Sequence, residues 1–162
     1  MIKNIISHFV LFSGLLFLVS NCTGIYEDGN ELSNDVKNRI KQISVDDLKA
    51  KIENQEDFLL IDVRQTSEYK KGSIEGAFSV PRGILETEIA STEFWEQEFV
   101  DPPADTTQII IFCAKGARGA LAVESLMKLG YKNVKNLDGG YSAFNPNPQA
   151  TENHASEGGC GG

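Results

Sequence analysis

The chain has 162 residues and a formal net charge of −8 at neutral pH, with 41% hydrophobic and 23% charged residues. This length suits one domain of about a hundred residues with extensions, and a domain of that size can bury a single hydrophobic core. The acidic balance argues against a nucleic-acid binder and against a protein that adheres electrostatically to anionic lipid.

The first residues of the chain have the pattern of a signal peptide. Lys3 precedes a nearly continuous apolar run from Ile5 to Val19, which is short for a membrane-spanning helix. We therefore predict a signal peptide over residues 1–21, of the lipoprotein type that the residues at its end indicate. An uncleaved signal anchor is the alternative interpretation, and either one places the folded part outside the cytoplasm.

Val19-Ser20-Asn21-Cys22 resembles the lipobox of bacterial lipoproteins, in which the signal is cut before the cysteine. Asn21 departs from the small residue that is usual at its position. The resemblance implies that Cys22 is the lipidation site and that the protein is held on a bacterial membrane, in the periplasm or at the cell surface. Stable attachment requires two or more acyl chains. Loss of Lys3 with the signal would leave a net charge of −9.

Residues 22–42 are polar and rich in Gly, Asn, Asp and Glu, which predicts a flexible tether between lipid and domain. Val36, Ile40 and Ile43 are spaced for one short helical face, which is too small to support a prediction of its own.

Helical and strand patterns alternate through the rest of the chain. The predicted elements are a helix from Ser44 to about Ile52, a strand at 58–63, a helical turn at 66–71, a strand at 77–80, helices at 83–90 and 92–99, a strand at 109–112, a helix at 119–129, a strand at 133–137 and a last helical turn from Gly139. Such alternation predicts an α/β fold with a parallel sheet and helices on both faces. Phe94, Trp95 and Phe99 are expected to join the core.

The segment Cys113-Ala-Lys-Gly-Ala-Arg118 carries the strongest functional signal. It lies between a predicted buried strand and a predicted helix, at the sheet edge where open α/β folds place their sites. A thiolate there would be stabilised by backbone N–H groups at the helix N-terminus and by Lys115 and Arg118, while Gly116 permits a tight turn. A buried structural cysteine is the alternative, and the glycine and two cations so close by argue against it.

This segment resembles the active-site loop of single-domain rhodanese-like sulfurtransferases, with the pattern Cys-x-x-Gly-x-Arg. Three further segments match the family in order over residues 43–145. These are the Asp-x-Arg of residues 61–64, the Gly-His-Ile-x-Gly-Ala segment at 72–81 and the closing Leu-x-Gly-Gly at 137–141. Ser73 stands where the family usually has histidine, and Phe144 where it usually has tryptophan. The resemblance implies a five-stranded parallel sheet.

The same resemblance implies sulfur transfer. Cys113 would take the outer sulfur of a small donor anion such as thiosulfate as a persulfide and pass it to a thiol, to cyanide or to a partner protein. No metal and no other cofactor is required. Phosphatases of this fold have five residues between cysteine and arginine, whereas this chain has four, which favours sulfur transfer. The loop residues assigned to donor binding are Ala114, Lys115, Gly116, Ala117, Arg118 and Gly119.

Asp62 and Arg64 are predicted to support the loop, and a purely structural ion pair is nearly as well favoured. Residues 146–162 are predicted to be a flexible tail that carries Cys160, either a resolving thiol for Cys113 or an incidental one. Two other functions therefore stay open. One is a low-turnover sulfur-carrier or interaction module, and the other is a thiol–disulfide protein that uses Cys113 and Cys160.

Overall fold

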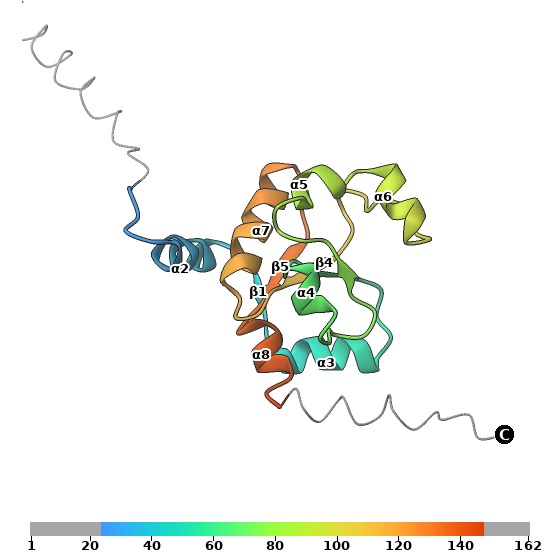
Figure 1. Ribbon diagram of the computed structural model, residues 1–162, viewed down its shortest axis with the longest axis horizontal. Coiled ribbons are helices and arrows are strands. Elements are labelled where there is room, and N and C mark those ends of the chain that lie inside the picture. Colours follow the sequence, from blue (N-terminus) through green and yellow to red (C-terminus); the bar gives the residue numbers. More distant parts are fainter. Residues whose placement is uncertain (1–23, 148–162) are drawn as a thin grey trace, which may run out of the picture.

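The computed structural model describes residues 24–147, which form an α/β fold around one sheet (Figure 1). The strands are β1 (Gln42–Ile43), β2 (Leu59–Asp62), β3 (Phe78–Ser79), β4 (Ile109–Phe112) and β5 (Val134–Leu137). The helices are α2 (Gly29–Arg39), α3 (Val45–Glu53), α4 (Thr66–Tyr69), α5 (Leu85–Glu88), α6 (Thr92–Gln97), α7 (Ala117–Lys128) and α8 (Gly140–Phe144).

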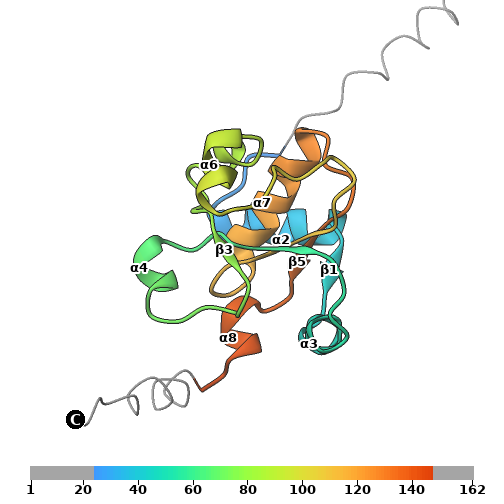
Figure 2. The same cartoon turned by 90° about the vertical axis from the view of Figure 1, so that its right-hand side faces the viewer.

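The five strands form one parallel sheet in the order β1-β5-β4-β2-β3. This confirms the predicted fold class. Strand β4 is central and buried throughout, because its apolar side chains alternate between two cores. Ile109 and Ile111 join the core under α5, α6 and α7, while Ile110 and Phe112 join the core under α3 and α8. Figure 2 shows α6 and α7 on one side of the sheet and α3 and α8 on the other.

Strand β1 was not among the predicted elements. It has only two residues, Gln42 and Ile43, and so offers no alternation from which a strand can be recognised. Its position depends on β5, with which Gln42 and Ile43 pair in register at Asn136 and Leu137. The helix that follows begins as predicted, because the Ser44 hydroxyl caps α3 by accepting a hydrogen bond from the N–H of the third helical residue, at 3.1 Å.

Residues 29–39 form helix α2, so the expectation of a flexible tether over residues 22–42 is wrong for this part. The Asp28 carboxylate caps the helix by accepting hydrogen bonds from backbone N–H groups in the first helical turn. Helix α2 lies against α7 (Figure 1), where Val36 is fully buried and Ile40 packs against the core. The small apolar face can stabilise the helix because it packs against α7, whereas an isolated helix of this length would be only marginally stable.

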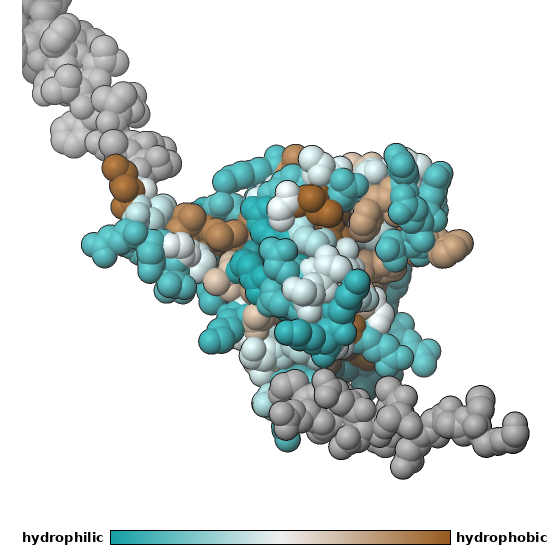
Figure 3. Space-filling view, in the orientation of Figure 1, coloured by the Kyte–Doolittle hydropathy of each residue, from teal (hydrophilic) through white to brown (hydrophobic). Residues whose placement is uncertain are grey.

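The aromatic residues near α6 divide between core and surface. Trp95 is fully buried, packs edge-on against Phe78 and Phe94, and donates its indole N–H to the carbonyl of Ile89 at 2.9 Å. Phe99 is 94% exposed, which corrects its assignment to the core. On the face in Figure 3, hydrophilic residues predominate and apolar ones form small separate groups. Within residues 24–147, the structure contains no helix with the length and apolar character needed to cross a bilayer.

Candidate active site

Cys113 directly follows the central strand β4, at the carboxyl edge of the sheet. Its side chain is buried, with 1% of its surface exposed, and the N–H of Gly116 donates a hydrogen bond to its Sγ at 3.2 Å. Gly116, where a tight turn was predicted, is the N-cap of α7 and has a φ of +88°, a left-handed conformation that glycine adopts without strain. The sulfur therefore lies beside the N-terminus of a twelve-residue helix, whose unpaired N–H groups and dipole favour an anion.

The N-terminal turn of α8 holds the cysteine loop in place. The N–H of Tyr141 donates to the carbonyl of Cys113 at 2.8 Å, and the N–H of Ser142 donates to the carbonyl of Ala114 at 3.0 Å. Gly140 makes this approach possible. A Cβ at Gly140 would lie 2.3 Å from the carbonyl oxygen of Cys113 and 2.8 Å from the nitrogen of Gly116. The Gly-Gly pair in the sequence was a signal for this contact, but its partner could be found only in the fold.

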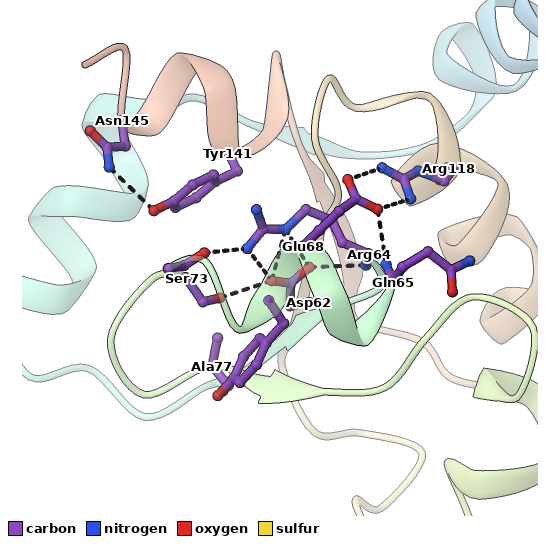
Figure 4. Close-up of polar contacts among 11 residues, drawn as sticks. Asp62, Arg64, Gln65, Glu68, Ser73, Ala77, Arg118, Tyr141 and Asn145 are labelled. Atoms are coloured by element: carbon purple, nitrogen blue, oxygen red, sulfur yellow. Dashed lines mark hydrogen bonds and ion pairs between the residues drawn. The ribbon is translucent and has the colours of Figure 1, made fainter. Parts of the chain in front are cut away.

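Asp62 and Arg64 form a buried ion pair with each other, with 0% and 5% of their surfaces exposed. The Nε and Nη2 of Arg64 donate to the Asp62 carboxylate at 2.9 and 2.7 Å, and Nη2 also donates to the carbonyl of Gly72 at 2.7 Å (Figure 4). Ser73, at the position of the family's usual histidine, donates its hydroxyl to Asp62 at 2.8 Å. Asp62 and Arg64 thus make these hydrogen bonds with each other, with Ser73 and with the carbonyl of Gly72, as a structural ion pair does.

This ion pair is connected to the cysteine loop through Tyr141. The Arg64 guanidinium lies 4.2 Å from the centroid of the Tyr141 ring, within cation–π distance. The backbone N–H of Tyr141 in turn holds the Cys113 carbonyl. Arg64 thus contacts the residue whose backbone N–H binds the cysteine loop, and the site-supporting role of Asp62 and Arg64 stays a prediction.

Arg118 forms a bidentate ion pair with Glu68 of α4. Its Nη1 and Nη2 lie 2.7 and 2.8 Å from the two carboxylate oxygens (Figure 4), and the backbone N–H of Gln65 donates to the same carboxylate at 3.0 Å. The Arg118 hydrogen bond is the main cause that lowers the pKa of Glu68 to about 2, against the opposing effect of burial. The pKa of Arg118 is raised, chiefly by Glu68 and further by the nearby Cys113 sulfur.

Glu68 was not among the residues predicted for the site. It precedes Arg118 by fifty positions, and no local pattern in the sequence connects the two. The structure brings them together because the turn after β2 and the loop after β4 lie at the same edge of the sheet.

The predicted loop residues divide between the turn after Cys113 and the start of α7, whose first three residues are Ala117, Arg118 and Gly119. Lys115 is exposed, Ala114, Ala117 and Arg118 are half-buried, and Gly116 and Gly119 are buried. Together, the helix N-terminus and two cations can stabilise a thiolate and a bound anion. Cys22 and Cys160 lie outside the described residues, so their predicted roles stay predictions.

Residues 44–147 match the family model for the rhodanese-like domain. The chain belongs to this family. The matched segment contains the whole sheet except β1, together with the Cys113 loop and the turn that holds it.

Named relatives of this rhodanese-like domain include enzymes and carriers. The chain is 34% identical over 85 residues to "Putative thiosulfate sulfurtransferase, mitochondrial" of Schizosaccharomyces pombe, covering 51% of this chain and 60% of that protein. It is 31% identical over 109 residues to "Putative sulfur carrier protein YrkF" of Bacillus subtilis, covering 67% of this chain and 53% of that protein. The chain thus spans somewhat over half the length of these curated relatives. It also resembles the solved human single-domain sulfurtransferase TSTD1, with a TM-score of 0.59, 26% identity, and coverage of 64% of this chain and 93% of that one.

Proposed function

We propose that this rhodanese-like protein transfers sulfane sulfur through a persulfide on Cys113. The observation that supports this most directly is the hydrogen bond from the Gly116 N–H to the Cys113 sulfur, at a helix N-terminus that also carries Arg118. Backbone N–H groups at a helix N-terminus, together with a nearby cation, stabilise the charge of a thiolate. Membership of the rhodanese-like family and a relative named as a thiosulfate sulfurtransferase support the same reaction.

The transfer divides into two displacements. The Cys113 thiolate attacks the outer sulfur of a donor such as thiosulfate, a new S–S bond forms, and sulfite leaves with the electron pair of the old one. A thiol or cyanide then attacks the terminal persulfide sulfur, and the Cys113 thiolate is the leaving group. Each step is balanced without an external oxidant or reductant, and the covalent intermediate predicts ping-pong kinetics.

Intact mass spectrometry of the purified full-length protein in detergent tests this proposal. We expect incubation with thiosulfate to add one sulfur atom to the wild type and none to Cys113→Ser, and cyanide to remove the added sulfur. A wild-type protein that gains no sulfur would contradict the proposal. A loss of two hydrogens that requires Cys160 would instead favour the thiol–disulfide function.

A low-turnover sulfur carrier is the second candidate, and the relative named as a sulfur carrier favours it. Both functions predict a Cys113 persulfide, so turnover separates them. Sustained release of sulfite in the presence of excess cyanide indicates an enzyme, whereas a single stoichiometric release indicates a carrier. Cys160→Ser should retain the persulfide in either case, because neither function uses a second thiol.

We also propose that the domain is held outside the cytoplasm by lipid on Cys22. The support for this is the sequence pattern around Cys22 alone. Helix α2 begins a few residues later and packs on α7, so only a short segment would separate the lipid from the folded domain.

A further inference from the structure

The ion pair between Glu68 and Arg118 places a fixed negative charge beside the cysteine loop. Both terminal nitrogens of Arg118 lie on the Glu68 carboxylate, at 2.7 and 2.8 Å (Figure 4). Arg118 is the second residue of α7, and the N-cap residue of that helix, Gly116, donates its N–H to the Cys113 sulfur. Arg118 therefore lies at the helix N-terminus that contacts the sulfur-accepting atom, and its guanidinium is held by a carboxylate supplied by α4.

This arrangement reduces the positive charge available to a donor anion. Lys115 and Arg118 would present two positive charges, but Glu68 compensates one of them. Glu68 is ionised at every physiological pH, because its pKa is about 2, and its negative charge therefore always offsets the positive charge of Arg118. An incoming anion must share Arg118 with Glu68 or displace it, and each further negative charge on the anion is repelled by the carboxylate.

We propose that Glu68 is a positioning and specificity-determining residue that holds Arg118 beside Cys113 and favours sulfur donors with one negative charge over dianions. The preferred class would then be organic thiosulfonates and persulfides, and thiosulfate would be a poorer donor. This inference rests on the proposed sulfur transfer through Cys113 and specifies which donors that site accepts.

Two donors with the same chemistry allow the effect of charge to be isolated. Thiosulfate is a dianion, and methanethiosulfonate is a monoanion. With each, the Cys113 thiolate attacks the outer sulfur and the S–S bond of the donor breaks. The electron pair leaves with sulfite in the first case and with methanesulfinate in the second. Dividing one rate by the other within a single variant cancels any general loss of active protein.

The test measures kcat/KM for persulfide formation with both donors, using full-length protein in detergent. Glu68→Gln removes the charge and keeps the side-chain length, and we expect it to raise the ratio of thiosulfate to methanethiosulfonate by about three- to tenfold. The gain should lie mainly in the KM for thiosulfate and should diminish with added salt. Glu86→Gln is the matched control, because Glu86 forms a comparable pair with Arg82 of the α5 region and should leave the ratio unchanged.

Glu68→Asp separates charge from geometry. It shortens the side chain but keeps the carboxylate, so the donor ratio should stay close to that of the wild type even if both rates fall. A ratio that does not rise in Glu68→Gln, or that rises equally in Glu68→Asp, would overturn this inference alone. A wild-type protein that forms no persulfide with either donor would overturn the proposed function and this inference with it.

Discussion

Replacing Gly140 with alanine tests whether the N-terminal turn of α8 positions Cys113. Gly140 has a φ of +62°, and an added Cβ would lie 2.3 Å from the Cys113 carbonyl oxygen and 2.8 Å from the Gly116 nitrogen. Both are backbone atoms and cannot rotate away. The left-handed backbone costs about 1–2 kcal/mol for an L-residue, and forced overpacking adds about 1–3 kcal/mol.

We therefore expect Gly140→Ala to lower the free energy of unfolding by about 2–5 kcal/mol, the sum of these two costs. Gly76→Ala is the matched control, because Gly76 also has a positive φ, +77°, but an added Cβ there would meet no atom within 4 Å. The control should lose only the backbone contribution, about 1–2 kcal/mol. Urea denaturation of both variants and the wild type gives the difference that belongs to the contact with the loop.

The same variant should impair persulfide formation beyond its effect on stability. The clash displaces the segment from Cys113 to Gly116, which contains both the sulfur and its N–H donor. Rates measured well below the unfolding transition should fall in Gly140→Ala and stay near wild type in Gly76→Ala. If the two variants were equally stable and equally active, the argument that Gly140 is required by this close approach would be refuted.

Three further predictions concern residues around the site and the proposed anchor. Asp62→Asn leaves the Arg64 guanidinium buried without its counter-ion, and should lower the unfolding free energy by about 3–5 kcal/mol; a urea midpoint equal to that of the wild type would count against it. The pKa of Glu68 is about 2 when folded, against 4.5 for the free side chain, so the stability it confers is present above pH 4.5 and lost as pH falls toward 2. The stability gap between wild type and Glu68→Gln, followed by urea denaturation across that range, should therefore close on acidification, and a constant gap would contradict the ion pair. Cys22→Ala should abolish the incorporation of labelled palmitate that we expect in the wild type, whereas an uncleaved signal anchor would leave even the wild type without label.

Much of the fold could be predicted from the sequence because its signals are local. The β-branched run at residues 109–111 is sufficient to indicate a buried strand, and it does form the centre of the sheet. Ser44 marks the start of α3 because capping depends on residues within one helical turn. The Cys113 loop could be placed at the carboxyl end of a strand for the same reason, since strand, loop and helix follow one another directly.

The remaining features depend on contacts between distant segments. Strand β1 is a strand only because β5 pairs with it, and α2 is a stable helix because α7 covers Val36. Glu68 reaches Arg118, and Gly140 reaches Cys113, because parallel strands bring their following turns to one edge of the sheet. The α/β class, the candidate nucleophile and its loop could be recognised in the sequence because each depends on a pattern only a few residues long. The carboxylate that pairs with Arg118 and the helix N-terminus that holds the loop are visible only in the folded protein, because such pairings arise from packing across the whole sheet.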